Sequence, residues 1–157
     1  MFYIGIENHI SPKSILDFFH TLLPHLHSEI YEDAYCYEEP TPDIAINYYE
    51  SPSEFKVVIE VSLLHKQIDE DTLCSIYTEL SRLLANQFRC KTLCEGTHYG
   101  DNPTYPGYSL IWNNNKAFLA DDYGCDFFDE GGGPVKILRE ISVDSKTQHG
   151  VLQQVLT

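Results

Sequence analysis

Apolar and polar positions alternate with a period of two in several short segments. In residues 55–63, five apolar side chains alternate with Lys56, Glu60 and Ser62, which predicts a strand with one buried and one wet face. Short runs of β-branched and aromatic residues predict further strands, with a hairpin around three asparagines. These further strands are expected at residues 2–6, 44–49, 108–112, 116–120 and 135–141.

Two other segments carry apolar side chains at the three-and-four spacing of a helix. The first is expected to begin at Ser11 as the N-cap, with Pro12 at the first helical position and Pro24 bending or ending the helix. The second is expected to begin at Asp69, because a cap and acidic first turn there precede an apolar stripe over residues 73–88.

The order of these elements predicts the fold class. Residues 29–43 and the Gly- and Pro-rich residues 96–107 lack a clean period and are expected to be surface loops. The remaining order predicts an α+β two-layer sandwich, with a mainly antiparallel sheet, two main helices, a ferredoxin-like βαββαβ core and extra carboxyl-terminal strands. We expect residues 1–143 to form one domain and residues 144–157 to be a peripheral tail.

The charge of the chain is one-sided and unevenly distributed. The 24 acidic and 10 basic residues leave a formal charge of -14, which repels nucleic acid and anionic lipid and attracts basic surfaces. No lysine or arginine lies between Lys13 and Lys56, or in residues 117–135. Acidic charge that serves only solubility is an open alternative, but two such blocks favour a cationic partner.

The familiar catalytic motifs are missing from the sequence. There is no P-loop, GxGxxG, GxSxG or HExxH pattern, so we expect no catalytic residues and no cofactor. Cys90, Cys94 and His98 lack the second cysteine pair of a structural zinc site, so we expect no metal. The odd number of cysteines favours free thiols. No apolar run approaches the roughly 20 residues needed to cross a bilayer, and the amino terminus lacks the basic region of a secretory signal, which predicts a cytoplasmic protein without membrane contact.

Tyrosines alternate with carboxylates in the first acidic block, and one recurs in the second. Tyrosine gives a large contact area at small entropic cost, and surrounding acids steer a basic partner. For each single tyrosine, packing back onto the sheet is the simpler alternative. Together, the two segments predict a partner-binding surface made of Glu29, Tyr31, Glu32, Asp33, Tyr35, Tyr37, Glu38, Glu39, Asp43, Asp121, Asp122, Tyr123, Asp126, Asp129 and Glu130.

Several features together resemble the bacterial immunity proteins of contact-dependent inhibition and polymorphic toxin systems. These are the size, the α+β layout, the FYIGIEN opening before a helix, and the DDYG and FFDE segments at residues 121–124 and 127–130. The resemblance implies a non-enzymatic antitoxin that binds the carboxyl-terminal domain of a cognate basic toxin, with a nuclease as the expected toxin.

Two other classes of function stay open. The first is a small-ligand-binding protein or enzyme that uses loop 96–107, whose signature would be a deep pocket lined by His98, Tyr99, Asp101 and Tyr105. The second is a structural module that associates with its own copies through a sheet edge.

Overall fold

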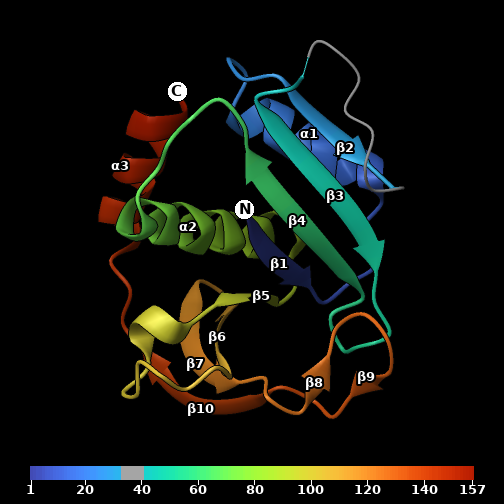
Figure 1. Cartoon of the computed structure of the whole chain (residues 1–157), viewed down its shortest axis with the longest axis vertical. Helices are drawn as coiled ribbons and strands as arrows, with labels where there is room; N and C mark the ends of the chain where they lie inside the picture. The colour runs from blue at the N-terminus through green and yellow to red at the C-terminus, as the bar shows by residue number, and fades with distance from the viewer. Residues whose placement is uncertain (33–40) are drawn as a thin grey trace.

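Three α-helices cover one face of an eight-stranded sheet in the computed structural model, which describes residues 1–32 and 41–157 (Figure 1). The strands of this sheet are β1 (Phe2–Ile6), β2 (Ser28–Tyr31), β3 (Ile44–Glu50), β4 (Val57–Leu63), β5 (Thr92–Glu95), β6 (Tyr108–Asn113), β7 (Lys116–Asp121) and β10 (Lys136–Ile141). The helices are α1 (Pro12–Leu22), α2 (Glu70–Phe88) and α3 (Ser145–Leu156), with a 3-10 turn η1 (Thr97–Tyr99). A small separate sheet pairs β8 (Cys125–Asp126) with β9 (Gly131–Gly132).

The topology confirms the predicted α+β sandwich. The sheet order is β10-β7-β6-β5-β1-β4-β3-β2, and its neighbouring strands are antiparallel except β2 and β3. Strand β4 lies between β1 and β3, so it splits the β1–α1–β3 unit as the ferredoxin-like plan requires. The fourth strand of this core is β5, which was not predicted from the sequence. Strands β6, β7 and β10 extend the sheet beyond β5.

Local signals in the sequence set the ends of the helices. Ser11 Oγ accepts from the Ser14 N–H at 3.2 Å, and Asp69 Oδ1 accepts from the Thr72 N–H at 2.8 Å, as their N-cap positions predict. Helix α1 ends at Leu22, before Pro24. Within residues 1–32 and 41–157, no helix combines the length and apolar character needed to cross a bilayer.

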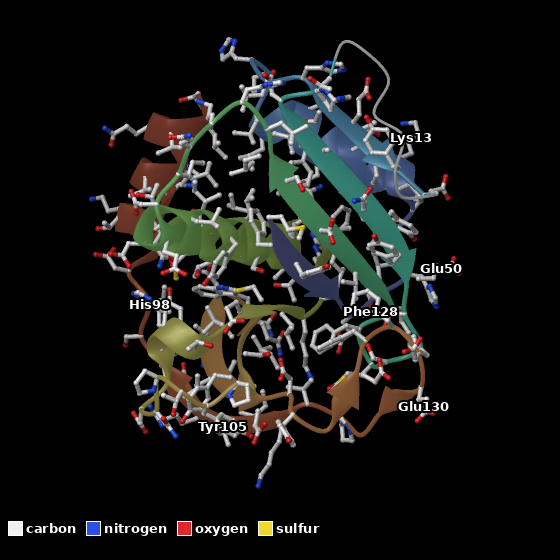
Figure 2. All side chains as sticks on the ribbon, in the orientation of Figure 1. Lys13, Glu50, His98, Tyr105, Phe128 and Glu130 are labelled. Carbon is white, nitrogen blue, oxygen red and sulfur yellow. The ribbon has the colours of Figure 1, made fainter. Side chains whose placement is uncertain are left out.

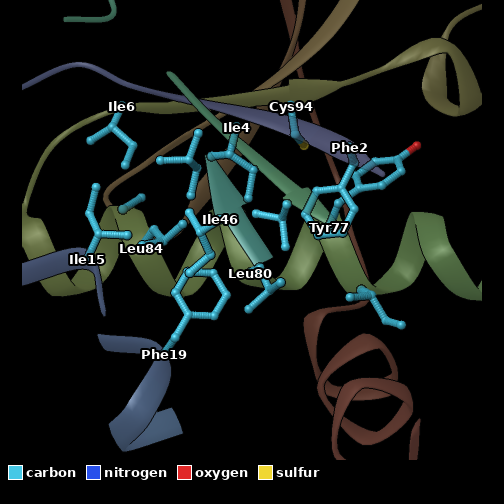
Figure 3. Close-up of a cluster of buried hydrophobic side chains, with 14 of the residues drawn as sticks. Phe2, Ile4, Ile6, Ile15, Phe19, Ile46, Tyr77, Leu80, Leu84 and Cys94 are labelled. Carbon is cyan, nitrogen blue, oxygen red and sulfur yellow. The ribbon is translucent and has the colours of Figure 1, made fainter. Parts of the chain in front are cut away.

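The main core lies between the sheet and its helices. Figure 3 shows Ile4 and Ile6 of β1 pointing towards α2, where Leu80 and Leu84 meet them. Phe19 of α1 is fully buried in the same cluster. The cysteines of the described residues are free thiols; Cys74, Cys90 and Cys94 are buried, and Cys125 is half-buried.

Two segments that were expected to be irregular contain regular elements. Residues 29–31 of the predicted loop 29–43 belong to strand β2. This strand forms because it pairs in parallel with β3 and its Ile30 packs against the main core. The expected peripheral tail contains α3, which begins after the N-cap Asp144 and buries Leu152 and Leu156. These two leucines are a helical turn apart, so one face of α3 joins the main core.

Phe55 was expected on the buried face of a strand over residues 55–63, but the strand begins at Val57. The turn before Val57 sends the Phe55 ring to the opposite face of the sheet, where it packs in a second apolar cluster with Leu93 and Ile111. Gly5 makes this possible, because a Cβ at position 5 would lie 3.2 Å from the Phe55 Cβ. The absent side chain therefore leaves the space that Phe55 fills.

Gly5→Val is expected to lower the free energy of unfolding by about 1–3 kcal/mol, because the added methyl groups would overlap Phe55. Urea denaturation followed by circular dichroism measures this change. Gly124→Val is the matched control, since a Cβ at Gly124 meets no atom within 4 Å. Equal effects at the two positions would contradict the close packing of Phe55 on β1.

Candidate functional site

The sheet face opposite the helices carries tyrosines and carboxylates. Four residues in register across neighbouring strands form a row on this face: Tyr31 of β2, Asn47 of β3, Glu60 of β4 and Tyr3 of β1. Asn47 Nδ2 donates to Glu60 Oε1 at 3.1 Å within the row. This face is called the open face below.

Residues 121–135, called the returned segment below, fold back onto the open face. The Phe128 ring makes edge-to-face contacts with Tyr3 and Tyr49, at centroid distances of 5.9 and 5.7 Å. Asp126 shapes the turn, because its carboxylate accepts from the backbone N–H groups of Phe128, Asp129 and Glu130. These bonds stabilise the charged form and lower the pKa of Asp126, so this carboxylate holds the conformation of the loop.

The fold brings parts of the two acidic blocks to one side of the molecule. Strand β2 ends at Tyr31, which is in register with Asn47 of β3, so Glu32 follows β2 beside the last residues of β3, which ends at Glu50. Glu130 precedes Gly131, where an added Cβ would lie 2.7 Å from the Pro52 carbonyl oxygen. Figure 2 shows Glu50, Phe128 and Glu130 along this side. We define the acidic edge as the exposed residues Glu32, Glu50, Asp129 and Glu130.

The acidic edge has no lysine or arginine partner among the residues that the structure describes. The lysines and arginines in ion pairs contact Glu7, Asp17, Glu79 and Asp101 instead. Lys56, in the turn after Glu50, donates to the Ser53 carbonyl oxygen at 3.0 Å. The negative charge of the edge is therefore left uncompensated by basic side chains.

Other predicted site residues lie apart from the acidic edge. Glu29 of β2 pairs with His27 Nε2 at 3.1 Å, and Asp43 accepts from the His27 N–H at 2.8 Å. Asp121 accepts from the Tyr105 hydroxyl at 2.7 Å, next to the exposed ring of Tyr123. Five predicted residues lie outside the described residues: Asp33, Tyr35, Tyr37, Glu38 and Glu39.

A partly open pocket of about 340 Å³ lies between β1, β5, β6, the first half of α2 and the segment at Phe127 and Phe128. Two carboxyl side chains, Glu95 and Asp122, are in its wall. Burial raises the pKa of Asp122, with the nearby charge of Glu95 acting in the same direction, while the Ser109 hydroxyl donates to Asp122 and opposes the shift.

The residues of the alternative ligand site do not line the pocket described above. Tyr99 bonds Thr78 and Gln148 beneath the loop, and Asp101 pairs with Arg139 at 3.0 Å. His98 lines an adjoining open depression, and Tyr99, Asp101 and Tyr105 are not among the residues that line it. Within residues 1–32 and 41–157, no cluster of three His, Cys, Asp or Glu side chains suits a metal ion.

Several residues of the site were not singled out from the sequence. Tyr3 had a usable signal, because it is out of phase with the apolar residues of its own strand, so the alternation alone places it on the open face. Glu95 had no comparable sequence signal, because strand β5 was not predicted. The chain matches no protein-family model, no curated protein and no solved structure. The candidate site therefore rests on the geometry described above.

Proposed function

We propose that this protein is an immunity protein that binds and neutralises the basic carboxyl-terminal domain of a cognate toxin, a nuclease in the simplest case. The observation that carries the proposal is the acidic edge, whose exposed carboxylates lack basic partners in the described chain. Exposed aromatic surface adjoins it, since the side chains of Tyr3 and Phe128 are 45% and 50% exposed. Uncompensated acids beside aromatics favour association with a cationic protein.

The nuclease assignment follows from electrostatics. A nuclease must present a cationic surface to the phosphate backbone, and an acidic protein surface competes for that surface. Aromatic rings beside the acids supply the apolar contact that slows dissociation. Neither step requires a catalytic group on this chain.

The direct test is protection. The protein is produced together with the toxin domain encoded by the neighbouring gene, and both cell survival and nuclease activity of the purified domain are measured. We expect survival, a one-to-one complex and loss of nuclease activity at equimolar protein. If cells die despite soluble protein and no complex forms, the immunity proposal is wrong.

Charge reversal at the acidic edge tests the surface itself. The double variant Glu50→Lys/Glu130→Lys is expected to slow association with the toxin domain about tenfold or more at low salt, because steering depends on the summed charge. The difference from wild type should shrink near 1 M salt, where the Debye length is only about 3 Å. Stopped-flow fluorescence measures the association rate.

The matched control is Asp17→Lys/Glu140→Lys, which makes the same change in net charge on α1 and β10. Its association rate should stay much closer to wild type. Equal slowing by the two double variants would show that net charge matters and the acidic edge does not. Thermal melts of both variants verify that they are folded.

A further inference from the structure

The pocket between β1, β5, β6 and α2 combines an apolar wall with two acids. Its apolar lining includes Met1, Tyr3, Leu73 and Phe128, from the amino terminus, α2 and the returned segment. Its acids, Glu95 and Asp122, approach one another because Glu95 on β5 is in register with Ser109 on β6, and Ser109 donates to Asp122. The pocket is therefore apolar along its sides and anionic at one place in its wall.

The charges in the pocket wall are unfavourable to one another. Asp122 is partly buried beside Glu95, so both burial and a like charge disfavour its ionised form. Among the described residues that line the pocket, there is no lysine or arginine to offset either carboxylate. Thr97 already donates to Glu95 and Ser109 to Asp122, but neither donor carries a charge, so a cation placed between the two acids would remove the repulsion and add charged hydrogen-bond donors.

A second depression continues the acidic character beyond the pocket. It shares Leu73, Tyr77 and Glu95 with the pocket and adds Glu70 and Asp71 from the first turn of α2. In the other direction, Phe128 of the pocket wall is followed directly by Asp129 and Glu130 of the acidic edge. The pocket thus has acidic residues on both of these sides.

We propose that this pocket receives an arginine side chain from the bound protein partner. The aliphatic part of the arginine packs against Tyr3, Leu73 and Phe128, and its guanidinium lies between Glu95 and Asp122. A guanidinium suits this place because its planar fork donates to two carboxylates at once and its weaker hydration makes partial burial less costly than for an ammonium. The proposal rests on the proposed function for the identity of the partner, but the chemistry of the pocket is tested separately.

The first experiment uses a capped Gly-Arg-Gly peptide and its citrulline counterpart, which keeps the shape of arginine and removes the charge. Titration followed by backbone NMR shifts should show weak binding of the arginine peptide, with the largest shifts at Tyr3, Glu95, Asp122 and Phe128. The citrulline peptide should bind about tenfold more weakly or not at all, and a Gly-Lys-Gly peptide more weakly than arginine. Equal shifts from the three peptides, or shifts centred elsewhere, would overturn the proposal.

The second experiment uses isosteric variants. Asp122→Asn and Glu95→Gln together should weaken arginine-peptide binding about tenfold or more, whereas Glu140→Gln on β10 should leave it unchanged. Asparagine keeps an oxygen that accepts from Ser109, so the fold is preserved, and a dispersed NMR spectrum verifies this. Unchanged peptide affinity in the double variant would overturn the assignment of these two acids.

Measurements with the toxin domain separate this inference from the proposed function. If wild-type protein and the double variant Asp122→Asn/Glu95→Gln bind the toxin with equal affinity, the pocket inference is wrong and the proposed function stands. If the arginine peptide binds as expected but no toxin is neutralised, the cation pocket stands and the immunity proposal is wrong. A tenfold or greater loss of toxin affinity in the double variant supports both.

Discussion

Glu79→Ala is expected to lower the free energy of unfolding by about 3–5 kcal/mol, because it leaves the positive charge of Arg82 largely buried without its partner. The Glu79 side chain is fully buried in α2 and contacts Arg82 and His149. Arg82 bonds both of its oxygens at 2.6 and 2.8 Å, and His149 Nδ1 of α3 lies 2.6 Å from Oε2. Arg82 also donates to Asn115 in the β6–β7 turn, so this one carboxylate joins three elements. Urea denaturation measures the loss.

The comparison for Glu79 is the exposed pair Lys13–Asp17 on α1, where the side chains are 85% and 58% accessible. Lys13→Ala should leave the unfolding midpoint within experimental error of wild type, because water already solvates both charges. A small effect at Glu79, comparable to that at Lys13, would show that the link between α2, α3 and the hairpin contributes little to stability.

Leu152→Ala is expected to cost about 2–5 kcal/mol, through lost apolar burial and the cavity left behind. Leu152 lies on the inner face of α3 and has no exposed surface. The same denaturation measurement applies, and an accompanying loss of helical circular dichroism would indicate that α3 detaches as a unit.

Gln153→Ala is the control for Leu152, because Gln153 is the next residue in α3 and is exposed. Its effect should stay within about 0.5 kcal/mol of wild type. If Leu152→Ala were equally mild, α3 would be a peripheral element, as the sequence had suggested.

The elements that were predicted correctly carry strong local signals. The β6–β7 hairpin was expected from its three asparagines, and Asn114 and Asn115 adopt positive φ of 50° and 62°. Helix α2 has an acidic cap and a long apolar stripe, and it begins and ends close to the expected residues. In these segments, the local sequence already contains the information that decides the structure.

The missed elements depend on distant contacts. Strand β5 has four residues directly after a helix, too few for alternation to be recognised, and it forms because β1 and β6 pair with its two edges. Helix α3 contains Gly150 and only a sparse apolar face, so its pattern is weak, and packing on α2 stabilises it. Tertiary contacts therefore outweigh local propensity in both cases.

The candidate site was predictable in composition and not in arrangement. Acidic charge and aromatic content near Glu32 and Glu130 were evident from the sequence. The approach of Phe128 to Tyr3 and Tyr49 was not, because it joins segments almost 80 residues or more apart in the chain. Asp122 lies beside Glu95 because β5 pairs with β6 and Ser109 donates to Asp122, an arrangement that no spacing pattern could have indicated.

The returned segment is anchored to the β3–β4 turn at two points. The Val135 N–H donates to Glu54 Oε1 at 2.6 Å, and Gly131 lies against the Pro52 carbonyl where no larger residue would fit. Anchoring of this kind fixes the spacing between Glu50 and Glu130 before any partner arrives. In the proposed complex, little affinity would be lost to the ordering of these groups, because the contact surface is already a preorganised template.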